Sequence, residues 1–494
     1  MLRTNRTLLL LVLSSLSLLL MAGCGSGASI VTPVMGGFTN SSLNGTYAFS
    51  ISGQNAAGFF AVAGSFQANG SGALTGGTLD FTSPSGVFTN QALTGSYAVR
   101  SDGRTTATVT STNVALNLDF VLLNTSSGLA IRFQSTATGS GSIDLQSASA
   151  FNLASLAGSL AFNVAGVDSG GTNPESSVGL VTFDATGAIT SGVLDDHDLF
   201  FAATTNLPVT PASGAVSSPA AGNGRGTVTI TTTLGPRTFA YYVVDANHVK
   251  LVEIDASITT PFLAGDAFRQ SSTTVSGSFA FTLAGATTSG TTVFVAGGIL
   301  NTDGAGNILG TSVTDINNGG GFFQAVATTG TYSVSGGRGT ATLNGGFGSV
   351  NLAFYPSTGG LQTLEIDTPI VASGTALQQS GAPFSNSSIN GSFGLNLTGV
   401  DIVNSVEVDG IAQFNTTGTG TLSGAFDFND GGALSNSLAL NGTYTVSSNG
   451  RAVATLNPSS LGTFNVIFYM ASGSRVLFME PDVNQVSVGV FASQ

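Results

Sequence analysis

Pairs of carboxylates are the first residues in this chain whose type and spacing suggest chemistry. A Glu is followed two residues later by an Asp at 253–255, 365–367 and 480–482, whereas the corresponding place nearer the N-terminus holds Arg132 and Gln134. On a strand, this spacing puts both carboxylates on one face. Such pairs hydrolyse glycosides when they flank the scissile bond, but two acids adjacent on one strand flank nothing. We therefore interpret them as a solvated strand face or as partners of arginines.

A second constellation, one Asp and one Arg, occurs four times. The aspartates are Asp80, Asp195, Asp315 and Asp427, and the arginines, each preceded by Gly, are Arg104, Arg225, Arg338 and Arg451. We expect an ion pair within each repeat, of the type Asp80 to Arg104, since a bidentate pair would fix a barrel end or a sheet corner. The alternative is that these eight residues bind a ligand carboxylate or a sugar at the mouth of each unit.

The densest group of potential metal ligands is the run Asp195-Asp196-His197-Asp198. Its spacing fits no standard calcium loop, and zinc usually takes several His or Cys ligands, whereas this chain has two His and one Cys. The run predicts a polar hairpin, with no metal and no cofactor. Neither His197 nor His248 stands beside a nucleophile signature, so the sequence predicts no catalytic residue and no enzyme.

These residues belong to a tandem array. A strand seed with two glycines eight residues apart recurs at 43–53, 156–166, 275–285 and 389–399. Apolar residues alternate through each seed, which indicates one buried and one wet face. A turn glycine follows each seed, and each repeat ends in Gly-x-x-x-x-Gln, at Gln146, Gln270, Gln379 and Gln494. We expect four complete units, of which the second departs from the pattern with a segment from Pro208 to Pro219.

The fold class predicted is all-β. Turn signals divide each unit into about eight strands, and short consecutive hairpins favour an up-and-down barrel over a Greek-key sandwich. We therefore expect four tandem antiparallel domains at 41–149, 153–271, 272–380 and 385–494. The alternating first strand resembles those of lipocalin and avidin barrels. The array as a whole resembles uncharacterised Gly/Thr-rich repeat lipoproteins of bacteria, a family that brings no known activity.

The N-terminus predicts export. Arg3 and Arg6 precede an apolar run from Leu8 to Leu20, as in a secretory signal. The following Met21-Ala22-Gly23-Cys24 resembles the lipobox of bacterial lipoproteins. The resemblance implies a signal peptide at 1–23, a lipidated Cys24 and a tether at 24–40, with Gly25 favouring the outer membrane. The alternative is an ordinary signal with a chance cysteine. Because Cys24 is the one cysteine, no intrachain disulfide can form.

Composition limits the kinds of partner that this protein is expected to bind. The net charge is −13, and two of the 12 basic residues lie in the signal, which disfavours nucleic acid as a partner. The leading hypothesis is a secreted, lipid-anchored, non-enzymatic protein of the bacterial outer membrane or cell surface that binds or scaffolds a glycan or an envelope protein. The first alternative is a small-ligand or glycan-binding protein with a site in each barrel mouth. The second is a hydrolase centred on the second repeat.

Overall fold

The computed structural model describes residues 37–494 apart from 256–259, 272–273, 289–291 and 320. The predicted signal peptide and Cys24 lie outside these residues. In the described ranges no helix has both the length and the apolar character that a membrane crossing requires. The described residues belong to one compact unit.

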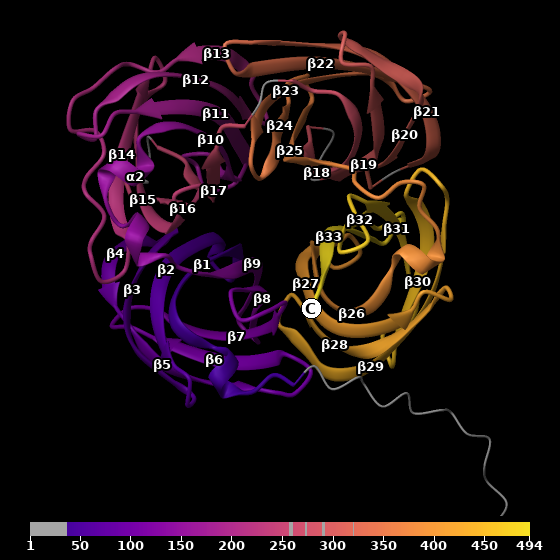
Figure 1. Cartoon of the computed structure of the whole chain (residues 1–494), viewed down its shortest axis with the longest axis horizontal. Coiled ribbons are helices and arrows are strands. Elements are labelled where there is room, and N and C mark those ends of the chain that lie inside the picture. The colour runs from indigo at the N-terminus through magenta and orange to yellow at the C-terminus, as the bar shows by residue number, and fades with distance from the viewer. Residues whose placement is uncertain (1–36, 256–259, 272–273, 289–291, 320) are drawn as a thin grey trace, which may run out of the picture. The chain divides into compact units, whose positions relative to one another are not determined.

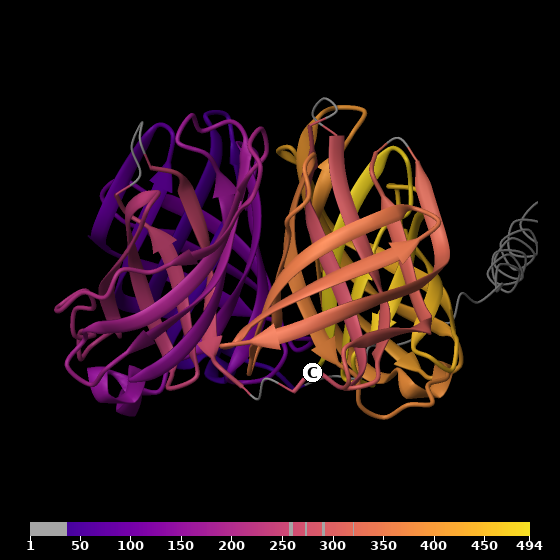
Figure 2. The same ribbon diagram turned by 90° about the horizontal axis from the view of Figure 1, so that it is seen from above.

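The all-β prediction is confirmed, with four antiparallel sheets that follow one another along the chain (Figure 1). Helix in the described residues is limited to α2 (Leu153–Leu156) and the 3-10 turns η1 (Asn40–Ser42), η2 (Ala148–Ala150) and η3 (Asn386–Ser388). Neighbouring strands are consecutive in sequence, except that in the first sheet the strand Thr94–Val99 pairs with Ala73–Ser83 and not with Gly86–Ala92. The last strand pairs with the first in each sheet. This is the meander of an up-and-down barrel, and Figure 2 shows its strands running obliquely around each barrel.

Barrel 1 closes through the pairing of β2 with β3. Its strands are β1 (Asn44–Asn55), β2 (Gly58–Asn69), β3 (Ala73–Ser83), β4 (Gly86–Ala92), β5 (Thr94–Val99), β6 (Arg104–Thr110), β7 (Ala115–Leu122), β8 (Ser127–Gln134) and β9 (Ala137–Leu145).

Barrel 2 is open between β13 and β14. The segment from Pro208 to Pro219 lies at this opening and forms two isolated bridges, Ile189 to Ala212 and Val216 to Val228. The strands are β10 (Gly158–Val167), β11 (Pro174–Phe183), β12 (Ile189–Asp198), β13 (Thr204–Pro208), β14 (Arg225–Thr232), β15 (Gly235–Asp245), β16 (His248–Glu253) and β17 (Phe262–Arg269).

Barrels 3 and 4 are closed. Barrel 3 contains β18 (Gly277–Thr287), β19 (Thr292–Thr302), β20 (Asn307–Asn317), β21 (Phe322–Ser335), β22 (Arg338–Gly345), β23 (Gly348–Ser357), β24 (Gly360–Glu365) and β25 (Ile370–Gln378). Barrel 4 contains β26 (Asn390–Asp401), β27 (Val406–Thr417), β28 (Thr421–Asp430), β29 (Ala433–Val446), β30 (Arg451–Pro458), β31 (Phe464–Met470), β32 (Arg475–Met479) and β33 (Gln485–Ser493).

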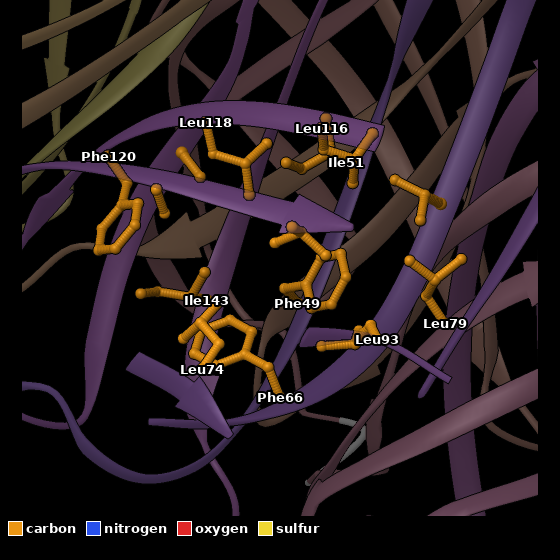
Figure 3. Packing of buried hydrophobic residues seen from close by; sticks show 14 of the residues in the cluster. Phe49, Ile51, Phe66, Leu74, Leu79, Leu93, Leu116, Leu118, Phe120 and Ile143 are labelled. Carbon is orange, nitrogen blue, oxygen red and sulfur yellow. The ribbon is translucent and has the colours of Figure 1, made fainter. Parts of the chain in front are cut away.

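Each barrel has its own apolar core, built from the alternate residues that the seeds predict. In barrel 1, Phe49 and Ile51 of β1 point inward and meet Phe66 and Leu118 from other strands (Figure 3). The turn glycines are also required by conformation. Gly70, for example, has φ +74°, which an L side chain rarely adopts, so the turn between β2 and β3 needs glycine.

Candidate functional site

The repeated Asp and Arg residues meet between barrels. The Arg225 guanidinium of barrel 2 donates two hydrogen bonds to Asp80 of barrel 1, Nε to Oδ2 and Nη2 to Oδ1, both 2.7 Å. In the same way Arg338 of barrel 3 binds Asp195 of barrel 2, and Arg451 of barrel 4 binds Asp315 of barrel 3. The predicted pair within one repeat is therefore wrong. Asp80 stands between the core residues Leu79 and Phe81, so period two turns its side chain out of its own barrel.

A tyrosine from the arginine-bearing barrel completes each of these three contacts. The hydroxyls of Tyr242, Tyr355 and Tyr469 donate to Asp80, Asp195 and Asp315 at 2.5, 2.6 and 2.8 Å. Two effects raise the pKa of all three phenols well above the ordinary value. Burial is the larger effect, and the charge of the neighbouring carboxylate is the second. The phenols therefore stay protonated and act as permanent donors. Because all three aspartates are fully buried, the charges are compensated by these hydrogen bonds and not by water.

The same aspartates also fix a bulge in their own barrels. The backbone N–H of Asn90, Asn206 and Ala325 donates to Asp80, Asp195 and Asp315 at 2.8, 2.9 and 2.7 Å. These residues have φ of +50°, +55° and +49°, a conformation that costs about 1–2 kcal/mol for a residue with a side chain. The carboxylate thus holds a strained bulge, an Arg and a Tyr at once, and we call this arrangement a joint.

The glutamine that ends a repeat also reaches into the next barrel. Gln146 Nε2 donates to the carbonyl oxygens of Asn223 and Val243, and Gln379 Nε2 donates to those of Asn449 and Met470. Gln494 Nε2 donates to the carbonyls of Asp102 and Leu122 in barrel 1. Barrel 4 therefore contacts barrel 1, and the four barrels form a closed cycle of contacts.

The joint that closes this cycle, between barrels 4 and 1, differs from the other three. Arg104 Nη1 is 3.6 Å from Asp427 Oδ2, while Arg104 Nε donates to Asp102 of its own turn at 3.0 Å. Val121 stands where the other joints have tyrosine, since it pairs with Arg104 as Tyr242 pairs with Arg225. The bulge is retained, because Ser437 has φ +53° and its N–H donates to Asp427.

Acidic side chains replace apolar ones in this closing joint. Asp119 takes the place that Ala240 has in barrel 2, and burial raises its pKa to about 7, helped by the charge of Asp427. Asp409 accepts a hydrogen bond from Thr138 Oγ1 of barrel 1 at 2.6 Å, and burial raises its pKa to about 7. Desolvation and Asp409 raise the pKa of the adjacent Glu407 well above its ordinary value. These carboxyls are held in a poorly hydrated contact.

The Glu-Asp pairs lie at barrel ends. The sequence predicts that these acids form a solvated strand face or bind the repeated arginines, and for the glutamates this prediction is wrong. Glu253, Glu365 and Glu480 are buried beside the barrel cores, and desolvation raises the pKa of Glu365 to about 9 and that of Glu480 to about 8. In barrel 1 the same place holds Arg132, whose guanidinium lies 4.5 Å from the centre of the Phe60 ring. The carboxylates of Asp255, Asp367 and Asp482 accept backbone N–H groups.

The run 195–198 is part of strand β12 and not the predicted polar hairpin. Its residues alternate between two surroundings: Asp195 enters the joint with Arg338, and Asp196 binds Arg237 Nη1 at 2.8 Å inside the end of barrel 2. Arg237 Nη2 also binds Glu175 at 2.7 Å. His197 Nδ1 lies 3.0 Å from the Glu365 carbonyl oxygen of barrel 3. Among the described residues no cluster of His, Cys, Asp and Glu has the makings of a metal site.

The interiors of barrels 2 and 3 leave little room. Each has an internal space of about 40 Å³, lined almost wholly by apolar residues such as Phe162 and Phe354. A further space of about 10 Å³ lies beside Arg237. A water molecule occupies about 30 Å³ in the liquid, so none of these spaces admits a sugar or a substrate of similar size.

A larger cavity, of about 360 Å³, lies between barrels 2, 3 and 4. Its polar lining includes Asn163 and Asp266 from barrel 2, Gln362 and Thr375 from barrel 3, and Arg475 from barrel 4. We call it the central cavity. Behind it the fully buried Lys250 binds Asp144 of barrel 1 at 2.9 Å and lies 3.4 Å from Asp266. Burial opposes ionisation of Asp266, but Lys250 and His248 hold its pKa below the ordinary value.

Sequence reasoning found the Asp and Arg residues of the joints and missed their tyrosines and the central cavity. Tyr242, Tyr355 and Tyr469 follow the Gly-Arg pair by 17, 17 and 18 residues, which is the signal that reveals them. Arg475 carries no such signal. It begins β32, and the residues that begin the corresponding strands β8, β16 and β24 are Ser127, His248 and Gly360. Use of the eight Asp and Arg residues as ligand-binding groups stays a prediction.

Comparison with known proteins shows no matching family model and no matching curated protein. Among solved structures, a double mutant of the vaccine antigen transferrin binding protein B from Haemophilus parasuis is 11% identical over 76% of this chain and 82% of that chain, with a TM-score of 0.21. Intact Ap-TbpB is 13% identical over 74% and 83%, with a TM-score of 0.18. A DUF3598 protein of unknown function from Nostoc punctiforme is 8% identical over 44% and 94%, with a TM-score of 0.15. Likenesses this weak carry no argument about function.

Proposed function

We propose that this chain is a lipid-anchored, non-enzymatic binding scaffold of a bacterial cell envelope. The observation that carries the proposal is the closed cycle of joints. Its strongest polar groups, three bidentate Arg-Asp pairs with their tyrosines, hold barrel to barrel, and their aspartates are fully buried. Charges used in this way position four domains relative to one another, which suits a scaffold better than a catalyst.

The two alternatives receive less support from the geometry. A ligand site in each barrel mouth needs an open interior, and the interiors of barrels 2 and 3 hold spaces of about 40 Å³. A hydrolase in barrel 2 needs acids beside a substrate cleft. Glu175 and Asp196 are instead tied to Arg237, beside a space of about 10 Å³. We therefore propose that the protein binds its partner at a surface shared by several barrels.

The anchor is tested in the native host by replacing Cys24 with Ser and labelling the cells with a radioactive fatty acid. The expected result is loss of the label and release of the protein from the membrane fraction, because the thiol is the attachment point. Ser26→Ala, which lies just beyond the lipobox, is the matched control and keeps both. Labelled lipid retained by the Cys24→Ser variant would contradict the anchor.

The binding role is tested by screening the full-length protein, solubilised in detergent, against arrays of glycans and envelope proteins. A reproducible, saturable partner is the expected result. Turnover of glycosides by the wild-type protein, abolished when Glu253 is replaced by Gln, would instead support the hydrolase.

A further inference from the structure

Arg475 is the unexplained arginine of this protein. Each of the other arginines in the described residues donates a side-chain hydrogen bond, to a carboxylate, a carbonyl, an amide or a hydroxyl oxygen. Within those residues, the Arg475 guanidinium has neither a hydrogen bond nor a carboxylate within 4 Å. Its side chain is exposed and lines the central cavity. Nearby protein lowers its pKa through desolvation, while Asp144 opposes the shift.

The surrounding charges leave this arginine available. Asp266, which lines the cavity, and Asp144, whose charge acts on Arg475, are both bound to Lys250, and Asp266 also accepts from His248 Nε2 at 2.7 Å. A guanidinium is planar and presents paired N–H donors, so it matches a carboxylate better than any other common anion except phosphate. Arg475 therefore offers a bidentate site for one negative group.

The other walls offer acceptors for hydroxyl groups. Asn163 Nδ2 donates to the Gly374 carbonyl at 3.0 Å, and Gln362 Nε2 donates to Ser357 Oγ at 3.1 Å. Within the described chain the oxygen atoms of these two amides accept no hydrogen bond, and both residues line the cavity. Thr282, Thr375 and Thr398 add hydroxyls, while Leu377, Leu477 and Val488 supply an apolar wall. The cavity thus combines hydrogen-bonding groups with an apolar wall, and small-molecule sites use both.

We propose that the central cavity binds a small hydroxylated monocarboxylate of the sugar-acid class. The carboxylate binds Arg475, the hydroxyls donate to the oxygens of Asn163 and Gln362, and the apolar face of the sugar ring packs on the leucines. The volume of about 360 Å³ lies at the lower end of the range of roughly 300–1,000 Å³ for such sites. The net charge of −13 disfavours long polyanions, so the ligand is one residue or the end of a chain. This inference rests on the proposed binding function and names its ligand class.

The test is calorimetric titration of the full-length protein, in detergent, with D-glucuronate and D-galacturonate, and with D-glucose as the neutral analogue. Saturable one-to-one binding of at least one uronate is expected, with no measurable binding of glucose. Arg475→Gln should weaken uronate binding at least tenfold, and Arg475→Lys should recover part of the loss. Because the guanidinium makes no bond within the protein, the thermal midpoint of Arg475→Gln should equal that of wild type. Thr375→Phe, which fills the cavity, should also abolish binding.

Arg100→Gln removes an exposed guanidinium outside the cavity and is the matched control, with unchanged uronate affinity expected. Equal affinity in wild type and Arg475→Gln would overturn the proposal, and so would glucose binding as strong as uronate binding, or the absence of uronate binding at millimolar concentration. None of these outcomes affects the Cys24 labelling result or the array screen, so the sugar-acid site and the anchored scaffold fail separately.

Discussion

The three joints between consecutive barrels and the joint that closes the cycle are built from the same positions, yet they use different chemistry. The consecutive joints bury seven, five and nine apolar residues in clusters shared by two barrels, whereas the closing joint buries three. The closing joint compensates with polar contacts, among them Ser140 Oγ to Asn396 Oδ1 at 2.6 Å. Asn429 Nδ2 adds donations to three carbonyls of barrel 1, those of Arg132, Gln134 and Ala137.

This difference fits the order of the barrels along the chain. Consecutive barrels are held together covalently, and apolar contact supports them without regard to pH. The closing joint links parts of the chain that are more than 250 residues apart, as between Ser140 and Asn396, and it contains carboxyls whose pKa burial raises to about 7. The closing joint is thus the part of the cycle most sensitive to conditions, and the predictions below compare it with the others.

The largest expected effect comes from removing one arginine of a consecutive joint. Arg338→Ala leaves Asp195 buried without its bidentate partner, and we expect the free energy of unfolding to fall by about 3–5 kcal/mol. Arg104→Ala in the closing joint should cost about 1 kcal/mol, since its contact with Asp427 is longer and single. Urea unfolding followed by tyrosine fluorescence measures both. Equal losses would show that the two kinds of joint do not differ.

A tyrosine hydroxyl should have the next largest effect. Tyr355→Phe removes the 2.6 Å hydrogen bond to Asp195 and keeps the packing of the ring, so the loss should be about 1.5–3 kcal/mol, as for a hydrogen bond to a charged group. Tyr332→Phe serves as the control within barrel 3, because Tyr332 donates to the uncharged Val275 carbonyl. Its loss should be about 1 kcal/mol. A smaller loss for Tyr355→Phe than for Tyr332→Phe would contradict the assigned role.

The closing joint should make stability depend on pH. Asp119 and Asp409 have pKa values of about 7 in the folded protein and about 3.9 when unfolded, so the folded state holds protons that the unfolded state has released. Their contribution is fully present below pH ~4 and is lost as the pH rises through ~7, at about 1.4 kcal/mol per pH unit for each group.

Asp409→Asn should remove one such contribution and flatten the dependence between pH 5 and pH 6.5, measured by unfolding in urea at each pH. Asp303→Asn is the control. Asp303 is an exposed turn residue whose pKa is lowered by hydrogen bonds from the Asn307 side chain and nearby backbone N–H groups. Its titration therefore changes the free energy of unfolding only below about pH 5. If the free energy of unfolding of Asp409→Asn depends on pH as steeply as that of wild type, Asp409 is not the titrating group, and the prediction is contradicted.

Much of the fold follows from sequence, because local rules determine it. Alternation in the seeds predicts the buried face of β1, and the turn glycines predict the hairpins. The partners of Asp80 and Arg104 do not follow, since period two shows that both side chains leave their own barrel but not which barrel they meet. The buried state of Glu365 was also missed. Its place one residue after an outward-facing Leu364 is visible only once the strand register is known.

The cycle itself is tested most directly by cross-linking across the closing joint. Ser140→Cys and Asn396→Cys are combined with Cys24→Ser, so that no other thiol is present, and the protein is oxidised at low concentration to join the two contacting thiols as a disulfide. We predict a linked peptide pair that joins barrels 1 and 4 within a monomer, while either single variant gives none. Failure to form that link, or links found only between molecules, would contradict a closed cycle of four barrels.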